Sequence, residues 1–391
     1  MIVSNNMLFS IEEGDGKGKI MVAMKDIKAG TELFVTTRPL LFLKKEYYST
    51  FDKHGDFGIY LAAYFTFVRR LPRFNRNRYM CLFGPTAGTF ADAIRLFAMN
   101  LTKVQEHASI VLVEKEVEGF VKISSIWKHN AVCTSNAGML AVFETSSRMS
   151  HSCNPNCALE FTDLGCICRA IVPVEKAEEL TLEYDSSLRY LFTQQRKQRL
   201  RELYQFDCDC DRCNSHGDDN RKFPCLSGCC KGIHMMSNLE AEDTSSVAFL
   251  IDADIGEGRG TTTALNPCTV CNLLPTTQQA NGAYLQEKKI AAFIDLLKKS
   301  MGVEEFDRFS EDNCIKVLNM IDAQHLPPLH SLSGAALFIQ LQVSSYLHKL
   351  DHNYHELVLK CARRYGEWLE GVNTFPSVRL IDELSGVARL L

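Results

Sequence analysis

The sequence predicts an α+β protein built from a mostly β N-terminal domain with helical insertions, a cysteine-rich segment and an all-helical C-terminal lobe. Short apolar runs bounded by glycine and proline predict the strands. Sixteen cysteines, dense in the middle of the chain, predict a metal-bearing segment. Apolar residues at helical spacing toward the C-terminus predict the helices. We expect the parts to span 1–206 (with an inserted region about 44–125), 207–275 and 276–391.

The composition limits the class of protein. The 391 residues are 46% hydrophobic and 23% charged, which are ordinary values for a globular protein of two or three domains. A net charge of −4 argues against nucleic-acid binding through bulk charge. The sequence has no apolar stretch near the roughly 20 residues of a membrane helix and no signal-like N-terminus. We therefore expect no membrane association, an intracellular place in cytoplasm and/or nucleus, and thiols that bind metal rather than pair.

Local patterns place the elements of the N-terminal and C-terminal parts. The expected strands are Glu32–Val35, Leu40–Leu43 and a hairpin of Ala158–Phe161 and Cys166–Ile171, turned by Asp163-Leu164-Gly165. The expected helices are 88–112, Ser187–Tyr204, one around Ile290–Leu297, one around Leu337–Tyr346, and one with Leu357, Cys361, Tyr365 and Trp368 on one side. The C-terminal helices suit either an ordinary bundle or a helical repeat.

The strongest local pattern is the run Cys208-Asp209-Cys210-Asp211-Arg212-Cys213. Three thiolates within six residues can converge on one metal ion, and a closed structural zinc site needs a fourth ligand from elsewhere. We choose Cys153 as that ligand. The alternative, free buried thiols, is disfavoured because three aspartates make the segment a poor core.

A second cysteine set consists of Cys225 with Cys229 or Cys230, followed by Cys268 and Cys271. Two separated pairs are the usual arrangement of a zinc ribbon. Cys230 is favoured over Cys229 because Lys231-Gly232 follows it as a turn should. Neither set looks catalytic, since full cysteine ligation leaves no open position for water.

Three further stretches carry a resemblance to a known family. They are Arg148-Met149-Ser150-His151-Ser152-Cys153-Asn154-Pro155-Asn156-Cys157, Glu178-Glu179-Leu180-Thr181-Leu182-Glu183-Tyr184, and Gly16-Lys17-Gly18-Lys19-Ile20-Met21-Val22-Ala23. The first resembles the Asn-His-Ser-Cys-x-Pro-Asn signature of SET-domain protein lysine methyltransferases. The second resembles their second signature, which ends in the active-site tyrosine, and the third is similar to their N-terminal cofactor loop. The three-cysteine run resembles the post-SET zinc motif, where the first signature supplies the fourth ligand, here Cys153.

The run Leu203–Cys208 and the helical C-terminal lobe are similar to those of the SMYD-like subgroup. Two departures stand out. The inserted region contains a single cysteine, Cys81, so we expect the MYND zinc finger to be missing. Position 150 is Ser where the family has Asn, a residue that helps to hold the cofactor.

The resemblance implies a SET β-fold and an S-adenosyl-L-methionine-dependent protein-lysine N-methyltransferase acting on a histone or non-histone protein, with structural Zn²⁺. Tyr184 takes the catalytic role, and Tyr184, Tyr204 and Phe206 line the lysine channel. The residues implied at the cofactor are Gly16, Lys17, Gly18, Lys19, Asn130, Ser147, Ser150, His151, Tyr204 and Phe206. His151 is expected to contact the cofactor rather than act as a general base.

Two rival functions remain. Ser150 motivates the first, a catalytically weak or inactive SET-fold zinc-binding scaffold or interaction protein. The second is a zinc-dependent nucleic-acid protein that uses the basic run Arg69, Arg70, Arg73, Arg76 and Arg78. We favour a solvated surface for that run, and likewise for Arg196-Lys197-Gln198-Arg199.

Overall fold

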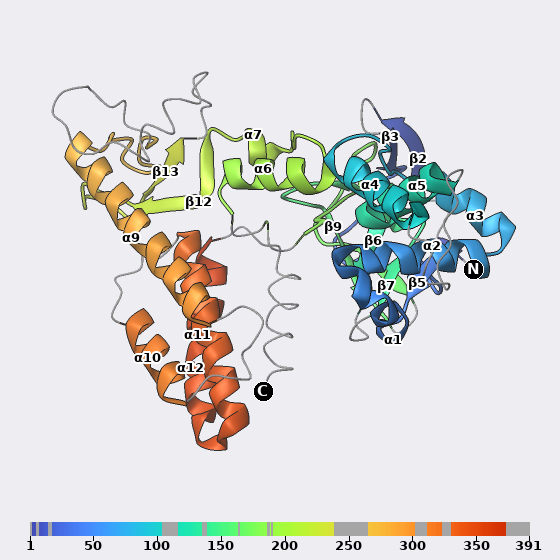
Figure 1. Ribbon diagram of the computed structural model, residues 1–391. Coiled ribbons are helices and arrows are strands. Elements are labelled where there is room, and N and C mark those ends of the chain that lie inside the picture. Colours follow the sequence, from blue (N-terminus) through green and yellow to red (C-terminus); the bar gives the residue numbers. More distant parts are fainter. Residues whose placement is uncertain are drawn as a thin grey trace. The chain divides into compact units, whose positions relative to one another are not determined.

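The computed structural model describes residues 2–4, 8–14, 18–103, 116–134, 139–162, 165–185, 188, 191–237, 265–301, 311–322 and 330–372. The chain divides into two compact units, Met1–Tyr184 and Asp185–Leu391 (Figure 1). Among the described helices, none combines the length and apolarity needed to cross a bilayer. The predicted boundaries at 206 and 275 stay predictions.

The strands of the first unit form several small sheets. The largest is antiparallel, in the order β1 (Ile2–Ser4), β4 (Glu32–Thr36), β10 (Cys166–Ala170) and β9 (Cys157–Phe161). A three-stranded sheet contains β5 (Leu41–Leu43), β7 (Leu140–Val142) and β6 (Ala131–Cys133). The hairpin of β2 (Phe9–Gly14) and β3 (Gly18–Ala23) and the parallel pair β8 (Ser150–His151) and β11 (Thr181–Leu182) complete this part.

The predicted hairpin of β9 and β10 is confirmed, with Cys166 opposite Phe161 and Ala170 opposite Cys157. Inward-facing residues alternate along β10, so Cys166 and Cys168 are fully buried in the core with Met21 and Phe143. Residues 163 and 164 of the predicted turn lie outside the described residues.

A helical insertion with its own core separates β5 from β6. It comprises α1 (Lys45–Tyr48), η1 (Ser49–Phe57), α2 (Gly58–Arg70), α3 (Arg73–Met80), α4 (Thr89–Lys103) and α5 (Val117–Asn130). Leu61, Tyr79, Phe120 and Ile126 are fully buried in that core. The helix predicted over 88–112 corresponds to α4, and the part beyond 103 lies outside the described residues.

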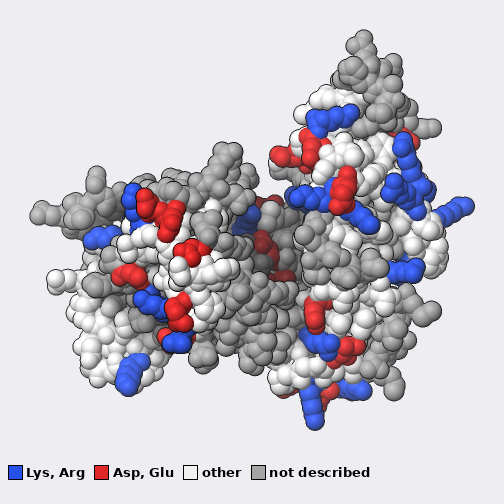
Figure 2. All heavy atoms as spheres, turned by 90° about the horizontal axis from the view of Figure 1, so that it is seen from below, with Lys and Arg blue, Asp and Glu red and all other residues white. Residues whose placement is uncertain are grey.

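Four arginines of α2 and α3 (Arg69, Arg70, Arg76 and Arg78) stack on aromatic rings of the same insertion. Arg69 lies over Phe65 and Arg70 over Tyr47, each with its guanidinium carbon 4.7 Å from the ring centre. Arg78 additionally pairs with Glu144. On the face of the molecule in Figure 2, basic side chains lie among acidic ones. The ring contacts and the Arg78–Glu144 ion pair show that these arginines pack within the protein. They add no support to the alternative that this run binds nucleic acid.

The second unit begins with α6 (Thr193–Tyr204) and α7 (Asp211–Asn214), followed by the hairpin of β12 (Gly217–Pro224) and β13 (Ile233–Ser237). It ends with α9 (Thr277–Met301), α10 (Glu311–Asp322), α11 (Ser331–Leu350), η6 (His352–Tyr354) and α12 (His355–Val372). Helices α11 and α12 lie side by side (Figure 1). A Cβ atom at Gly334 would come within 2.3 Å of the Trp368 ring, so glycine permits this close approach.

The predicted face of α12 is confirmed, whereas the side chains of Phe293 and Leu297 on the face predicted for 290–297 lie outside the described residues. Cys361, Tyr365 and Trp368 of α12 are buried against Leu337 and Leu341 of α11. Helix α10 was not predicted. The helix predicted from Ser187 begins only at Thr193, because Phe192 is extended and donates its backbone N–H to the Gln195 side chain at 3.1 Å.

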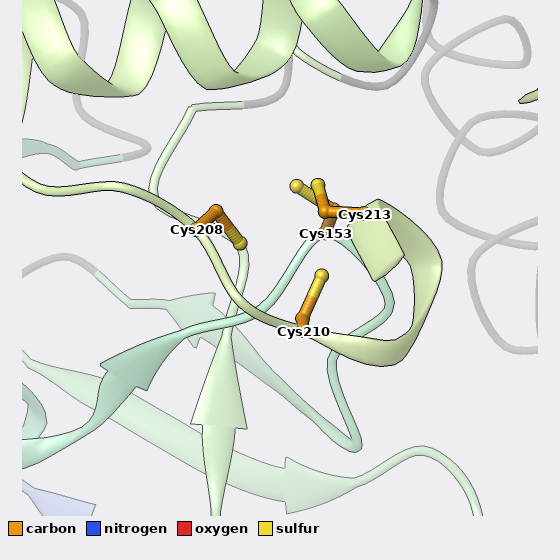
Figure 3. A group of neighbouring side chains, drawn as sticks. All are labelled: Cys153, Cys208, Cys210 and Cys213. Atoms are coloured by element: carbon orange, nitrogen blue, oxygen red, sulfur yellow. The ribbon is translucent and has the colours of Figure 1, made fainter. Parts of the chain in front are cut away.

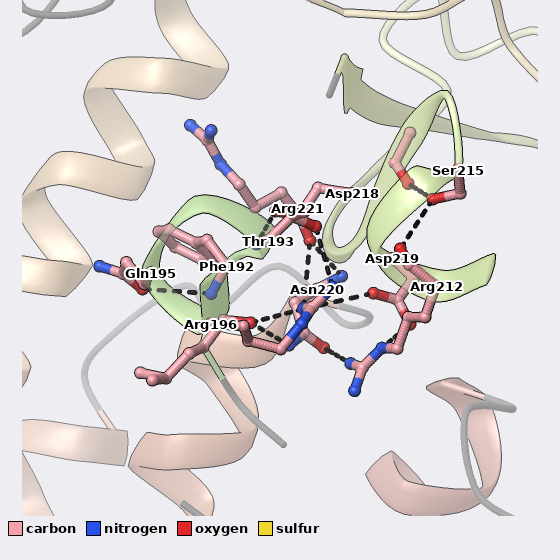
Figure 4. A network of polar contacts seen from close by, with 12 residues as sticks. Phe192, Thr193, Gln195, Arg196, Arg212, Ser215, Asp218, Asp219, Asn220 and Arg221 are labelled. Atoms are coloured by element: carbon pink, nitrogen blue, oxygen red, sulfur yellow. Dashed lines mark hydrogen bonds and ion pairs between the residues drawn. The ribbon is translucent and has the colours of Figure 1, made fainter. Parts of the chain in front are cut away.

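The expected solvated surface on α6 is wrong for Arg196, whose side chain has no exposed area. Its Nη1 donates to the Leu191 carbonyl at 2.7 Å and its Nη2 to the Thr193 hydroxyl at 2.9 Å. Asp218 and Asp219 lie 4.0 and 3.8 Å from the same guanidinium (Figure 4). Burial is tolerated because two aspartates from β12 compensate the charge.

Further polar contacts complete this network. Asp218 accepts the Thr193 N–H at 2.7 Å, and Asp219 accepts from Arg212 Nε at 2.7 Å. Asn220 Nδ2 donates to the Leu191 carbonyl at 2.7 Å (Figure 4). Two arginines therefore balance two aspartates at the junction of α6, α7 and β12.

Candidate active site and cysteine centres

Tyr184 ends the first unit, two residues after β11. Its hydroxyl donates to the Met149 carbonyl at 2.8 Å, and its side chain remains 38% exposed. The bond directs the hydroxyl hydrogen at Met149, so any further hydrogen bond to this oxygen is one that the oxygen accepts. The parallel pairing of β11 with β8 brings the two predicted signatures together, with Thr181 opposite Ser150 and Leu182 opposite His151.

His151 connects Tyr184 to the cysteine that follows β8. Its Nδ1 accepts the backbone N–H of Tyr184 at 3.2 Å, and its Nε2 lies 3.3 Å from the Cys153 sulfur. A backbone N–H can only donate, so the neutral ring carries its hydrogen on Nε2, directed at that sulfur. With both nitrogens engaged, the geometry argues against a general-base role for His151.

Asn156 is a positioning residue that the sequence interpretation missed. Its Nδ2 donates to Glu178 Oε1 at 2.9 Å and to the Glu179 carbonyl at 2.8 Å. Its Oδ1 accepts the Thr181 N–H at 2.8 Å, and the residue is 6% exposed. The buried amide thus holds the strand that leads to Tyr184. The Asn-Pro-Asn motif contained this residue without indicating its bonds.

A cavity of about 540 Å³ opens between the β2–β3 hairpin and the segment before β8, a size within the range of small-molecule sites. Its lining comprises Ile11, Glu12, Glu13, Lys19, Arg78, Glu144, Thr145 and Arg148. Three basic and three acidic groups suit a ligand that carries both charges. Arg78 comes from the insertion, so the sequence interpretation of the cofactor loop had no signal for it.

The predicted cofactor residues fall into different places. Lys19 lines the cavity, and Gly18 has a φ of 71°, which favours glycine, while Gly16 and Lys17 lie outside the described residues. Ser147 Oγ donates to the Phe143 carbonyl at 2.8 Å. Asn130 Nδ2 donates to the carbonyls of Phe83 and Ile126 at 2.8 and 2.7 Å, which commits its amide hydrogens to the backbone.

Tyr204 and Phe206 belong to the second unit, at the end of α6 and just after it. Burial, followed by the nearby carboxylate of Asp185, raises the pKa of the Tyr204 hydroxyl. Gln205 lies between them in the left-handed region, with a φ of 63°, and ends α6. Their place in a lysine channel stays a prediction.

The first cysteine group contains Cys153, Cys208, Cys210 and Cys213. Their sulfur atoms all lie within 4.8 Å of one another and point toward a common centre (Figure 3). Tetrahedral Zn²⁺ with bonds of about 2.3 Å places its sulfurs about 3.8 Å apart, so the donor set fits zinc. The His151 N–H directed at Cys153 is the kind of contact that stabilises a metal-bound thiolate.

The second group brings together Cys225, Cys230, Cys268 and Cys271. Sulfur separations of 3.8 Å for Cys225–Cys271 and 3.5 Å for Cys230–Cys268 match the zinc geometry. Burial favours the neutral thiol of Cys225, but hydrogen bonds from Cys230 and the Ser227 backbone lower its pKa to about 6. Cys229 is exposed and stands outside this group.

Parts of this chain are similar to known proteins. The SET domain family model matches residues 18–185. Mouse histone-lysine N-methyltransferase SMYD3 is 33% identical over 104 residues, which cover 26% of this chain and 23% of that protein. Zebrafish N-lysine methyltransferase SMYD2-A is 24% identical over 211 residues, covering 51% of this chain and 44% of that one. The match to the solved structure of Rubisco LSMT bound to AdoMet covers 92% of this chain and 90% of that one, at 11% identity and a TM-score of 0.37.

Residues 18–185 therefore form a SET domain. Within that class the chain is SMYD-like, with a mixed helix and strand fold, two cysteine groups able to hold zinc and a helical C-terminal region. The aligned part spans less than half the length of these SMYD relatives. The expected lack of a MYND finger stays a prediction.

Proposed function

We propose that this chain is an S-adenosyl-L-methionine-dependent protein-lysine N-methyltransferase acting on a histone or non-histone protein. The carrying observation is the Tyr184 hydroxyl, held by the Met149 carbonyl at 2.8 Å on a partly exposed ring at the end of the SET domain. The SMYD relatives, named as lysine methyltransferases, support the same reaction.

Lysine methylation requires an aligned, uncharged amine at the reacting carbon. S-adenosylmethionine, when bound, supplies the electrophilic methyl group. The Tyr184 oxygen, with its hydrogen committed to Met149, can accept weak C–H hydrogen bonds, and its ring face attracts a cation. Tyr184 thereby orients the reacting groups, and removing water from the amine favours its neutral form.

The chain's residues also suit binding of the cofactor. Gly18 permits a close backbone approach, and Lys19 offers a charge complementary to a carboxylate at the rim of the cavity. Arg148 and Glu144 add one charge of each sign to the same cavity. Zn²⁺ in the two cysteine groups would act structurally, because four thiolates leave no position for water or substrate.

Transfer of labelled methyl groups tests the proposal. Zinc-replete protein with labelled S-adenosylmethionine and candidate proteins should place the label on lysine, as located by mass spectrometry. Tyr184→Phe should lose most of this transfer. Tyr60→Phe, which removes a hydroxyl from the helical insertion, is the matched control and should keep it. Full transfer by Tyr184→Phe, or none by the native protein across a broad protein array, contradicts the proposal.

The second candidate function, a SET-fold scaffold without useful catalysis, rests on Ser150. This residue lies half-buried on β8 beside His151, where a longer amide is usual in the family. Calorimetry with S-adenosylmethionine distinguishes the two functions. Micromolar binding supports the enzyme, and no binding at millimolar ligand supports the scaffold. Ser150→Asn should tighten the cofactor about tenfold, near 1.4 kcal/mol.

A further inference from the structure

Three histidines meet where α11 turns into α12. His348 lies in the last turn of α11, His352 opens η6 and His355 opens α12. The His348 ring centre lies 4.9 Å from that of His352 and 5.3 Å from that of His355. His348 is half-buried, and the other two are exposed to solvent. One inner imidazole is therefore in contact with two outer ones on a helical turn.

The inner histidine has a nitrogen without a partner. Among the residues that the structure describes, the buried Nδ1 of His348 has no hydrogen-bond partner. A buried polar atom left unpaired is unfavourable, so a ligand at this atom is favoured. Asp351 adds a carboxylate to the turn, where it accepts the Asn353 N–H at 2.9 Å.

We propose that His348, His352 and His355 form a binding site for a divalent transition-metal ion such as Zn²⁺ or Ni²⁺. Two imidazoles on one tetrahedral ion, with nitrogens about 2.0–2.1 Å from the metal, have ring centres roughly 5 Å apart. The observed separations of 4.9 and 5.3 Å match that arrangement. Within the described part of the chain, the three histidines do not reach the 4.8 Å convergence of the cysteine groups. Binding therefore includes rotation of imidazole rings about Cβ–Cγ.

This site differs in chemistry from the two cysteine centres. Imidazole nitrogens accept Zn²⁺, Ni²⁺ and Cu²⁺, whereas hard cations prefer oxygen ligands. Three protein ligands leave at least one position to water, and the two exposed rings give access from solvent. The ion would link the end of α11 to the start of α12, and so brace this turn independently of methyl transfer.

Nickel titration of the full-length, zinc-replete chain tests the site. Calorimetry should detect one additional Ni²⁺ per chain, with no zinc released to a chromophoric chelator. The double variant His352→Gln/His355→Gln should weaken this binding at least tenfold, and it removes exposed side chains only, so the fold should persist. His216→Gln removes an exposed histidine elsewhere and should leave binding unchanged.

Three results would overturn the proposal. They are the absence of an additional Ni²⁺ equivalent, equal binding by the native chain and the double variant, and nickel uptake matched by zinc release. The thermal midpoint provides a second readout that needs no direct binding signal. Nickel should raise the midpoint of the native chain and of His216→Gln, and should raise it less in the double variant. An equal rise in all three also contradicts the site.

Discussion

The polar regions around Arg196 and around Tyr184 differ in how far their hydrogen-bonded side chains are buried. Around Arg196, the side chains of Arg196 and Asp218 are buried, and two arginines face two aspartates. Around Tyr184, the buried groups Asn156 and His151 hold the backbone, while the Tyr184 ring remains 38% exposed.

The difference separates stability from chemistry. A polar group enclosed by its partners contributes to one fixed structure, and its loss exposes an unpaired charge to the interior. A hydroxyl on a partly exposed ring, with its hydrogen donated to the backbone, can accept a contact from a ligand. We therefore expect substitutions near Arg196 to change the free energy of unfolding, and substitutions near Tyr184 to change turnover.

The largest expected effect lies in the second cysteine group, close to the Arg196 network in sequence. Cys268→Ser should lose one Zn²⁺ per chain and melt the segment around it, because zinc binding supplies folding free energy there. Metal analysis and the thermal midpoint measure both effects. Cys229→Ser is the matched control, since Cys229 stands outside the group. Equal metal loss in both variants contradicts the ligand assignment.

Arg196→Met should destabilise the fold by about 3–5 kcal/mol, because it leaves Asp218 and Asp219 without their buried partner. Arg199→Met on the exposed side of α6 should change stability by less than about 0.5 kcal/mol. Denaturant unfolding gives both values. Equal unfolding free energies for the two variants would contradict the claim that the buried network around Arg196 stabilises the fold.

Glu287→Gln tests a second buried pair in the C-terminal unit. Burial raises the pKa of Glu287, but hydrogen bonds from His330 and Arg221 outweigh it and hold the pKa at about 2. A carboxyl group whose pKa is lowered in the folded state stabilises the fold fully above its unfolded pKa of 4.5. That stabilisation is lost as the pH falls from 4.5 through about 2. The variant should cost on the order of 3 kcal/mol at pH 7 and progressively less below pH 4.5. A pH-independent cost from pH 7 to pH 2 contradicts this cause.

Asn156→Ala should have a smaller effect on stability than Arg196→Met, about 1–3 kcal/mol for the bonds it removes. Asn156→Ala should reduce turnover more than Arg196→Met does, because the strand that leads to Tyr184 loses the hydrogen bonds that hold it in place. Steady-state kinetics should show a fall in kcat with little change in KM. Asn154→Ala removes an exposed amide from the same motif and serves as control. A KM change alone indicates that Asn156 affects binding rather than position.

The sequence predicted what short spacing and motif chemistry determine. Three cysteines in six residues constrain a metal centre, and their sulfur atoms do converge in the structure. Two apolar runs joined by Asp163-Leu164-Gly165 also sufficed to predict the hairpin of β9 and β10. In each case the information lay within a few residues of the feature.

What the sequence did not predict depends on distant partners. Arg196 looked solvated because its aspartates come more than 20 residues later, in a strand whose position only the fold fixes. Arg78 entered the cavity from the insertion for the same reason. Such contacts need tertiary structure, which overrides local charge patterns.

Tyr184→Phe tests the central claim most directly when turnover and unfolding are measured on one preparation. The substitution removes one hydroxyl and its bond to Met149, so the unfolding free energy should stay within about 1 kcal/mol of the native value. Methyl transfer should fall on the order of 100-fold, equivalent to about 2.7 kcal/mol of barrier. Unchanged transfer, or a loss explained by unfolding, would contradict the assignment of Tyr184 to the chemistry.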